Sequence, residues 1–353
     1  MDVSLTITIP RPDDWHVHLR EGDMLQAVIG YTSQRFRYAM VMPNLSTPIA
    51  TTEQARTYLQ LIKEVTPLSS PDFRPLMTLY CSDQLRVQDL LQGHAEGIVK
   101  AVKYYPAGAT TNSQSGGSAM LDYSQVFSSM EEHRIPLLVH AESTDPDVDI
   151  YDREAVFLER ELKTICERFP EMKITVEHIS TSDGIDFVNG HKQVGGSITP
   201  HHLSRNRSDM ISPSFHADLF CKPVINSEED RQKLVETAIS GDPSFFLGTD
   251  SAPHPTEAKY GKNAKAGVFN AAYGLEVVAE VFAKENRLDQ LAAFASYNGS
   301  AFYGYSHSDE NIVLTRQEVE LEVATHLSTQ SGNKVVLFGI EEASHWTIET
   351  ETV

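Results

Sequence analysis

Short apolar runs alternate with amphipathic stretches along most of the chain. Eight of these runs have the length and the β-branched or aromatic content of strands. They span residues 15–19, 38–42, 75–81, 97–105, 135–141, 173–179, 196–200 and 244–250. The pattern therefore predicts a chain in which strands and helices alternate.

The ends of several helices can be predicted from the segments between these runs. Thr51 with Gln54 three residues on has the pattern of a capping box, which starts a helix. Gly93 is expected to end a helix that begins near residue 83, because glycine readily adopts the left-handed conformation found after helices. Ser227, followed by Asp230, is expected to start another helix.

Strands that alternate with helices predict an α/β architecture, either a closed parallel barrel or a doubly wound sheet. The count of eight favours the TIM (β/α)8 barrel, whose usual length of about 250 residues fits within the chain. We expect a barrel over about residues 9–305, with a helix at 152–169, and a C-terminal extension at 306–353 packed on it. Residues 1–353 would then form a single domain.

Composition mainly excludes classes of partner. The chain has 353 residues, 29 of them Lys or Arg and 49 Asp or Glu, for a formal charge of −20. Nucleic acid and anionic membranes attract basic proteins, so neither is an expected partner. No signal-peptide pattern and no run near the roughly 18 apolar residues of a membrane span are present. Cys81, Cys166 and Cys221 are widely spaced and odd in number, which predicts reduced thiols in a cytoplasmic protein.

Polar residues gather in or just after the predicted strands. Active sites of TIM barrels are built at the C-terminal ends of their strands, so these positions are candidates for chemistry. Nine such residues come from six strands: His16, His18, Arg20, Asn44, Lys103, His140, His178, Asp250 and His254.

His16 and His18 are two residues apart on a strand, so both imidazoles point to one face and could hold a metal ion together. A pair of hydrogen-bonded histidines is the simpler alternative. His140 and His178 end two later strands, and each alone is more often a core or surface histidine. Asp250 follows the last strand and could merely cap a helix. The whole set of four histidines and one aspartate exceeds what one tetrahedral zinc requires.

Lys103 lies within the apolar run at residues 98–104. Its ammonium has no lone pair at neutral pH and is a poor metal ligand unless it is modified. Without further information, the expected state of Lys103 is a surface lysine with a buried stem.

Six motifs taken together resemble the dihydroorotases, a group of cyclic amidohydrolases in the amidohydrolase superfamily. The resemblance is to the shorter, bacterial-type class, and it runs in order from about residue 9 to about residue 305. The motifs are Asp14-Trp15-His16-Val17-His18-Leu19-Arg20, Met42-Pro43-Asn44, Val102-Lys103-Tyr104-Tyr105-Pro106, His140-Ala141-Glu142, Glu177-His178-Ile179 and Gly248-Thr249-Asp250-Ser251-Ala252-Pro253-His254.

The resemblance implies a centre of two zinc ions in each subunit of a homodimer. His16, His18 and Asp250 would bind the more buried zinc, and His140 and His178 would bind the other. N-carboxylation of Lys103 would convert a cation into an anionic oxygen ligand that bridges both ions, alongside a bridging hydroxide. This arrangement would leave the site net positive, although the chain as a whole is strongly acidic.

The implied reaction is the reversible hydrolysis of L-dihydroorotate to N-carbamoyl-L-aspartate in pyrimidine biosynthesis. The hydroxide would attack the ring amide carbonyl, and Asp250 would carry its proton to the leaving nitrogen. The resemblance also implies residues that contact this small anionic substrate. Those for the carboxylate are Arg20, Asn44 and His254; Thr110 and Thr111 lie on a loop over the substrate; Ala266 and the backbone of Lys222 add further contacts.

Two other functions remain open at this point. Dihydropyrimidinases, hydantoinases and allantoinases share the metal ligands, but Arg20 and His254 favour a substrate with a carboxylate. A non-catalytic amidohydrolase-like scaffold would typically have lost metal ligands, and none is missing here. His201 and His202 follow the seventh predicted strand and are expected to support the site without binding metal.

Overall fold

Eight parallel strands form the centre of the molecule. The computed structural model describes residues 5–114, 116–117 and 119–351. Its eight-stranded sheet has the order β2-β3-β4-β5-β6-β7-β8-β9, and every neighbouring pair is parallel. The strands are β2 (Asp14–Val17), β3 (Tyr38–Val41), β4 (Arg74–Tyr80), β5 (Val99–Tyr104), β6 (Leu137–Val139), β7 (Ile174–Val176), β8 (Val194–Ile198) and β9 (Phe245–Leu247).

The first and last strands of this sheet meet and close it into a barrel. The backbone N–H of Asp250 donates to His16 O at 2.8 Å, and that of His18 donates to Ser251 O at 3.0 Å. The predicted α/β TIM barrel is thereby confirmed, with each of the eight predicted runs containing one barrel strand or overlapping it.

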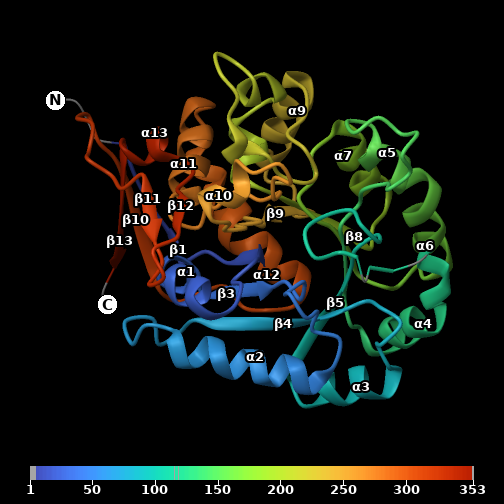
Figure 1. The fold of residues 1–353 in the computed structure, drawn as a ribbon. Helices are drawn as coiled ribbons and strands as arrows, with labels where there is room; N and C mark the ends of the chain where they lie inside the picture. The colour runs from blue at the N-terminus through green and yellow to red at the C-terminus, as the bar shows by residue number, and fades with distance from the viewer. Residues whose placement is uncertain (1–4, 115, 118, 352–353) are drawn as a thin grey trace.

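Helices follow the strands and lie on the outside of the sheet (Figure 1). Within the described ranges, none of them is long and apolar enough to cross a membrane. The main ones are α1 (Gly22–Arg35), α2 (Thr52–Val65), α3 (Val87–Ala95), α4 (Ser124–His133), α5 (Arg153–Phe157), α6 (Lys163–Arg168), α7 (Ser182–Gly190), α9 (Glu228–Ala238), α11 (Gly274–Lys284) and α12 (Asn298–Tyr303).

Most of the predicted helix ends are confirmed. Thr51 and Gln54 form the capping box at the start of α2, and the Ser227 side chain caps α9 by accepting from the Asp230 N–H. The helix predicted at 152–169 is one continuous element in which a π-helical turn joins α5 to α6.

The prediction for Gly93 is wrong. Helix α3 begins at Val87 and continues through Gly93 to Ala95, and the left-handed residue that follows it is Gly97, with a φ of +74°. Gly93 is instead required by packing, because a Cβ at this position would lie 2.3 Å from Thr52 Oγ1 and 2.7 Å from Val99 Cγ2. The glycine allows α3 to approach the start of α2 and the barrel strand β5.

We therefore expect Gly93→Ala to lower the free energy of unfolding by about 1–3 kcal/mol, the usual effect of overpacking a core. Gly30→Ala in α1 is the matched control, because its added methyl would meet only Pro67 Cγ at 3.8 Å. Denaturant unfolding followed by circular dichroism measures both. Equal stability of the two variants would contradict the packing argument.

The N-terminal end of the barrel is filled by apolar side chains. Trp15, Met40, Leu76, Leu138 and Phe246 belong to one buried cluster there, with Tyr303 stacked on Trp15 at a centroid distance of 4.6 Å. The residues of the strands that are candidates for chemistry lie at the opposite, C-terminal end, where TIM barrels build their active sites.

A second sheet joins the two ends of the described chain. Strand β1 (Thr6–Pro10) pairs antiparallel with β10 (Asn311–Arg316), which pairs with β13 (Trp346–Glu351). The hairpin of β11 (His326–Ser328) and β12 (Lys334–Val336) shares a buried apolar cluster with Phe269 and Ala272. The C-terminal segment thus packs beside the loop that follows Asp250.

Candidate active site

The C-terminal ends of the barrel strands surround a small polar pocket. It has room for about 20 Å³, and an adjoining cavity of about 370 Å³ shares Gly267 with it. The smaller pocket is the candidate site because its walls carry the chemistry. Its lining residues are His16, His18, Arg20, Asn44, Tyr105, Thr110, Thr111, His140, His178, Lys222, Asp250, Ala252, Ala266 and Gly267.

Three potential ligand atoms form a compact triangle at one side of this pocket. His16 Nε2 lies 3.2 Å from His18 Nε2, and Asp250 Oδ1 lies 3.2 Å from the first and 3.0 Å from the second. Zn–N distances of about 2.0–2.1 Å give a tetrahedron with edges of about 3.3–3.4 Å. The triangle therefore fits one face of a zinc coordination sphere closely.

A second pair of donors lies opposite. His140 Nδ1 is 3.1 Å from His178 Nε2, and the ring centres of His178 and His16 are 5.0 Å apart. All of these side chains are buried. Burial lowers the pKa of His18 to about 4 and that of His178 far below its usual range, so that both imidazoles keep a free lone pair at neutral pH. Neutral imidazoles are the form that binds metal.

Two glutamates lie beside His16 and His140, at the ring nitrogens that are not directed at the other potential ligand atoms. Glu177 Oε1 lies 3.0 Å from the outer nitrogen of His16, Nδ1, and Glu142 Oε2 lies 2.9 Å from the outer nitrogen of His140, Nε2. Carboxylates in this place orient metal-binding imidazoles and raise their basicity. Both residues belong to the motifs of the sequence, but nothing in their spacing predicted this contact.

Lys103 is completely buried, so the expectation of a surface lysine is wrong. Its Nζ forms an ion pair with Glu177 and lies 4.4 Å from the ring centre of Tyr105. Burial lowers the pKa of Lys103 despite that carboxylate. A lowered pKa favours the neutral amine, which is the form that reacts with carbon dioxide to give a carbamate.

Three of the residues at this site have a left-handed backbone conformation that non-glycine residues rarely adopt. The φ angles are +61° for Arg20, +44° for His178 and +45° for Asp250. Such strain concentrates at functional sites, where surrounding contacts hold it. For Asp250 one such contact is Asp14, whose carboxylate accepts from the backbone N–H of Thr249 at 2.8 Å and from its hydroxyl at 2.6 Å.

Arg20 lines the pocket, and His254 lies beside Arg20 in the lining of the adjoining cavity. Arg20 donates from Nε to Pro253 O at 3.2 Å, and its Nη2 is 3.0 Å from His254 Nε2. Burial, with help from the charges of Arg20 and Lys259, lowers the pKa of His254 to about 2, so this imidazole is neutral. No ion pair of Arg20 with a carboxylate occurs among the described residues. The guanidinium is therefore available to an anionic ligand.

A loop covers the pocket and is joined to Asn44. The Asn44 side-chain amide donates to Thr111 O at 3.0 Å, and the Asn112 amide donates back to Asn44 O at 3.2 Å. The hydroxyl of Thr111 reaches Ala266 O at 3.4 Å across the opening. Thr110, Thr111 and Asn44 all line the pocket, whereas the contribution of Asn112 was not foreseen from the sequence.

Lys222 lines the pocket as well, and its side chain has a defined partner. The ammonium lies 3.3 Å from Glu142 Oε1, while the other oxygen of Glu142 contacts His140. Lys222 is thereby connected to a candidate metal ligand through one carboxylate.

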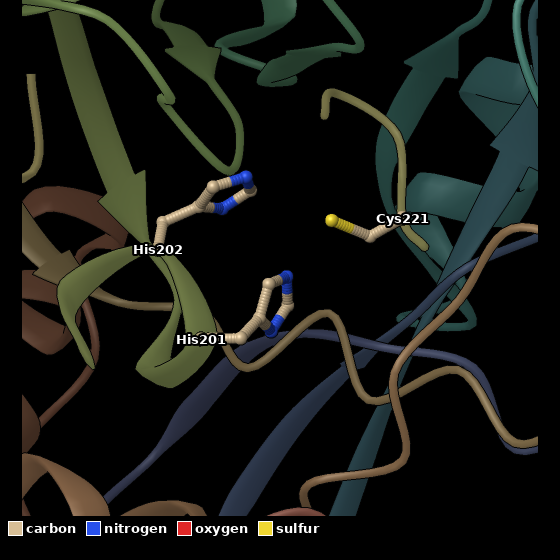
Figure 2. Close-up of side chains that lie close together, drawn as sticks. All are labelled: His201, His202 and Cys221. Carbon is tan, nitrogen blue, oxygen red and sulfur yellow. The ribbon is translucent and has the colours of Figure 1, made fainter. Parts of the chain in front are cut away.

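His201, His202 and Cys221 form a separate buried cluster beside the pocket (Figure 2). Their potential ligand atoms lie within 4.8 Å of one another. His202 Nε2 and the Cys221 thiol both lie 3.2 Å from Pro223 O, and Asn270 Nδ2 lies 3.1 Å from His201 Nδ1. The same Asn270 amide donates to Thr249 O at 2.7 Å, which links His201 to the segment that carries Asp250.

Comparison with known proteins agrees with this fold. Residues 9–312 match the family described as the amidohydrolase family. A dihydroorotase from Parasynechococcus marenigrum is 46% identical over 316 residues, which cover 89% of this chain and 92% of that protein. A dihydroorotase from Erythrobacter litoralis is 44% identical over 98% of this chain and 99% of its own length.

Solved structures give the same result. The dihydroorotase of Saccharomyces cerevisiae in complex with 5-fluoroorotic acid superposes with a TM-score of 0.88 at 29% identity, covering 99% of both chains. That of Campylobacter jejuni gives 0.87 at 31% identity, covering 100% of this chain and 99% of that one. An L-hydantoinase from Arthrobacter aurescens, at 15% identity and a TM-score of 0.76 over 94% of this chain and 82% of that one, shares the fold. The chain therefore belongs to the amidohydrolase family and, within it, to the dihydroorotases.

Proposed function

We propose that this protein hydrolyses the cyclic amide of L-dihydroorotate reversibly to N-carbamoyl-L-aspartate. The observation that carries the proposal is the juxtaposition of a buried set of metal-ligand atoms with an unpaired guanidinium. The ligand atoms of His16, His18 and Asp250 lie 3.0–3.2 Å apart, and Arg20 lines the same pocket. The metal-ligand atoms suit amide hydrolysis, and the guanidinium suits binding of a ring that carries a carboxylate.

Two zinc ions fit the donors of this pocket. His16, His18 and Asp250 would hold one ion, His140 and His178 would hold the other, and Lys103, once N-carboxylated, would bridge them. Such a metal pair supplies Lewis-acid polarisation of an amide carbonyl and hydroxide at neutral pH. The support for these assignments is the donor chemistry, the burial of every ligand and the glutamates beside His16 and His140.

Asp250 is the proposed proton carrier. Its Oδ1 lies within 3.2 Å of both His16 and His18, so the carboxylate is held at the centre of the ligand set. Asp250 would take a proton from the attacking water and deliver it to the ring nitrogen as the amide bond breaks. Its pKa is lowered well below the usual range by the nearby imidazoles, against the effect of burial, so it begins the cycle ionised.

The substrate carboxylate is placed between Arg20, Asn44 and His254 in this proposal. A guanidinium can grip a carboxylate with two parallel hydrogen bonds. The Asn44 amide and the neutral His254 ring would add a donor each. Thr110 and Thr111 would lie over the ring, and the backbones of Ala266 and Lys222 would contact its edge. Exclusion of water by such a loop is a common feature of enzymes that bind small substrates.

Hydrolysis of L-dihydroorotate by the purified protein is the direct test. We expect turnover that stops after chelation and returns with zinc, and no comparable turnover of hydantoin, allantoin or dihydrouracil. Turnover of a neutral ring instead would assign the protein to a different cyclic amidohydrolase activity. Failure to hydrolyse any of the four rings with metal bound would point to a non-catalytic scaffold.

We also propose a cytoplasmic homodimer in which residues 1–353 form one domain. The cytoplasmic assignment is supported by Cys81, Cys166 and Cys221, which are buried and free. The single domain is supported by the antiparallel pairing of β1 with β10, which fastens the start of the chain to its C-terminal segment. The dimer rests on the resemblance to the family.

A further inference from the structure

Lys259 carries a buried ammonium that forms no ion pair with a carboxylate of the described residues. It ends the short helix α10 (Thr256–Lys259), and its side chain is only 4% exposed. Its Nζ donates to Phe220 O at 2.7 Å and to Gly267 O at 2.6 Å, and no ion pair involves it in the part of the chain that the structure describes. Burial lowers its pKa to about 8. An unpaired buried charge destabilises a fold, so a group of this kind is a candidate for function.

The two carbonyl groups that Lys259 binds belong to two neighbouring backbone segments, both of which contribute residues to the candidate active site. Phe220 precedes Lys222 by two residues, and Gly267 follows Ala266; Lys222, Ala266 and Gly267 all line the pocket. Phe220 O also accepts from the Gly267 N–H at 2.9 Å. The ammonium and this backbone hydrogen bond together hold the segment at residues 220–222 against the segment at residues 266–267.

The segment at residues 266–267 contacts the part of the site where Arg20 lies. Ala266 O is 3.0 Å from His254 Nε2, and the same nitrogen is 3.0 Å from Arg20 Nη2. The charge of Lys259 is also among the causes of the low pKa of His254, so its field reaches this part of the site. In a chain with a formal charge of −20, a second fixed cation here raises the local potential for an anion.

We propose that Lys259 is a positioning and specificity-determining residue: it holds the segments at residues 220–222 and 266–267 in place and favours a substrate with a negative charge. The inference rests on the proposed function, because it assigns the carboxylate of dihydroorotate to the end of the pocket near Arg20. Lys259 does not touch the reacting atoms. It acts through the two backbone segments and through its electric field.

The test compares the wild type with Lys259→Met and Lys259→Arg, with exposed Lys262→Met as the matched control. Dissociation constants are measured for orotate and for orotamide, which differ in charge but little in size, together with KM and kcat for L-dihydroorotate. We expect Lys259→Met to raise the orotate dissociation constant and the dihydroorotate KM by on the order of tenfold, with a much smaller change in kcat. Orotamide binding should change little, and Lys259→Arg should recover part of the loss.

The possible failures are distinguishable. Wild-type orotate affinity in Lys259→Met would overturn the inference, provided that wild-type turnover of dihydroorotate is normal. Equal losses for orotate and orotamide would overturn the charge selectivity. Absence of dihydroorotate turnover in the wild type would instead overturn the proposed function. Should Lys259→Met fail to fold, Lys259→Gln, which keeps a donor without the charge, replaces it in the same measurements.

Discussion

Lys103→Ala should abolish dihydroorotate hydrolysis, and a short carboxylic acid such as acetate should restore part of it. Lys103 is fully buried and pairs with Glu177, whose other oxygen lies 3.0 Å from the candidate ligand His16. Truncation removes the amine that would be carboxylated and leaves a space that a free carboxylate can enter. The measurements are the hydrolysis rate with and without added acid and the metal content of the purified variant, which should fall.

Lys100→Ala is the control for this experiment, because Lys100 lies three residues earlier on the same strand and lines a cavity at the opposite end of the barrel. It should retain wild-type activity and metal content. Circular dichroism checks that Lys103→Ala folds, since the variant leaves the Glu177 carboxylate buried without its cation. Full activity of folded Lys103→Ala would rule out a bridging ligand at this position.

Arg20→Met should lower kcat/KM for L-dihydroorotate by about 100- to 1000-fold. Loss of one partner of a desolvated charge pair costs about 3–4 kcal/mol, and each 1.4 kcal/mol corresponds to a factor of ten. The loss should appear mainly in KM if Arg20 grips the carboxylate equally in the ground state and the transition state. Steady-state kinetics over a wide range of substrate concentration measures both parameters.

Two comparisons make the Arg20 result specific. Metal content should match the wild type, because Arg20 bonds to Pro253 and His254 and to none of the candidate ligands. Arg160→Met, at a side chain that is 62% exposed, should have no effect on activity. A small change of kcat/KM in Arg20→Met, with metal bound, would argue against a substrate carboxylate at this end of the pocket.

Much of the candidate site could be predicted because its chemistry follows local rules. His16 and His18 point together because alternate residues of a strand share a face. The histidines and Asp250 follow apolar runs directly, and the ends of parallel strands meet at one end of a barrel. The caps at Thr51 and Ser227 depend on residues only three positions apart, and both were correct.

Long-range contacts could not be predicted from these local rules. The burial of Lys103 and its pairing with Glu177 join residues 74 positions apart, and the link between Asn44 and Asn112 spans 68. Gly93 was misread as a helix end because its reason for being glycine lies in Thr52 and Val99, outside its own helix. The buried contacts of Lys259 could not be predicted from the sequence, since its partners are backbone carbonyl groups, which every residue possesses.

From the chain alone we could thus predict the order of strands and helices, the helix starts at Thr51 and Ser227, and the residue types that can bind metal and a carboxylate. These depend on hydrophobic periodicity and on hydrogen bonds within a few residues. Tertiary contacts were needed to show which nitrogens face one another, which charges lie unpaired and which loops touch across the pocket. The reason is closure of the barrel, which places β2 beside β9 and brings His18 within 3.0 Å of Asp250, 232 residues away.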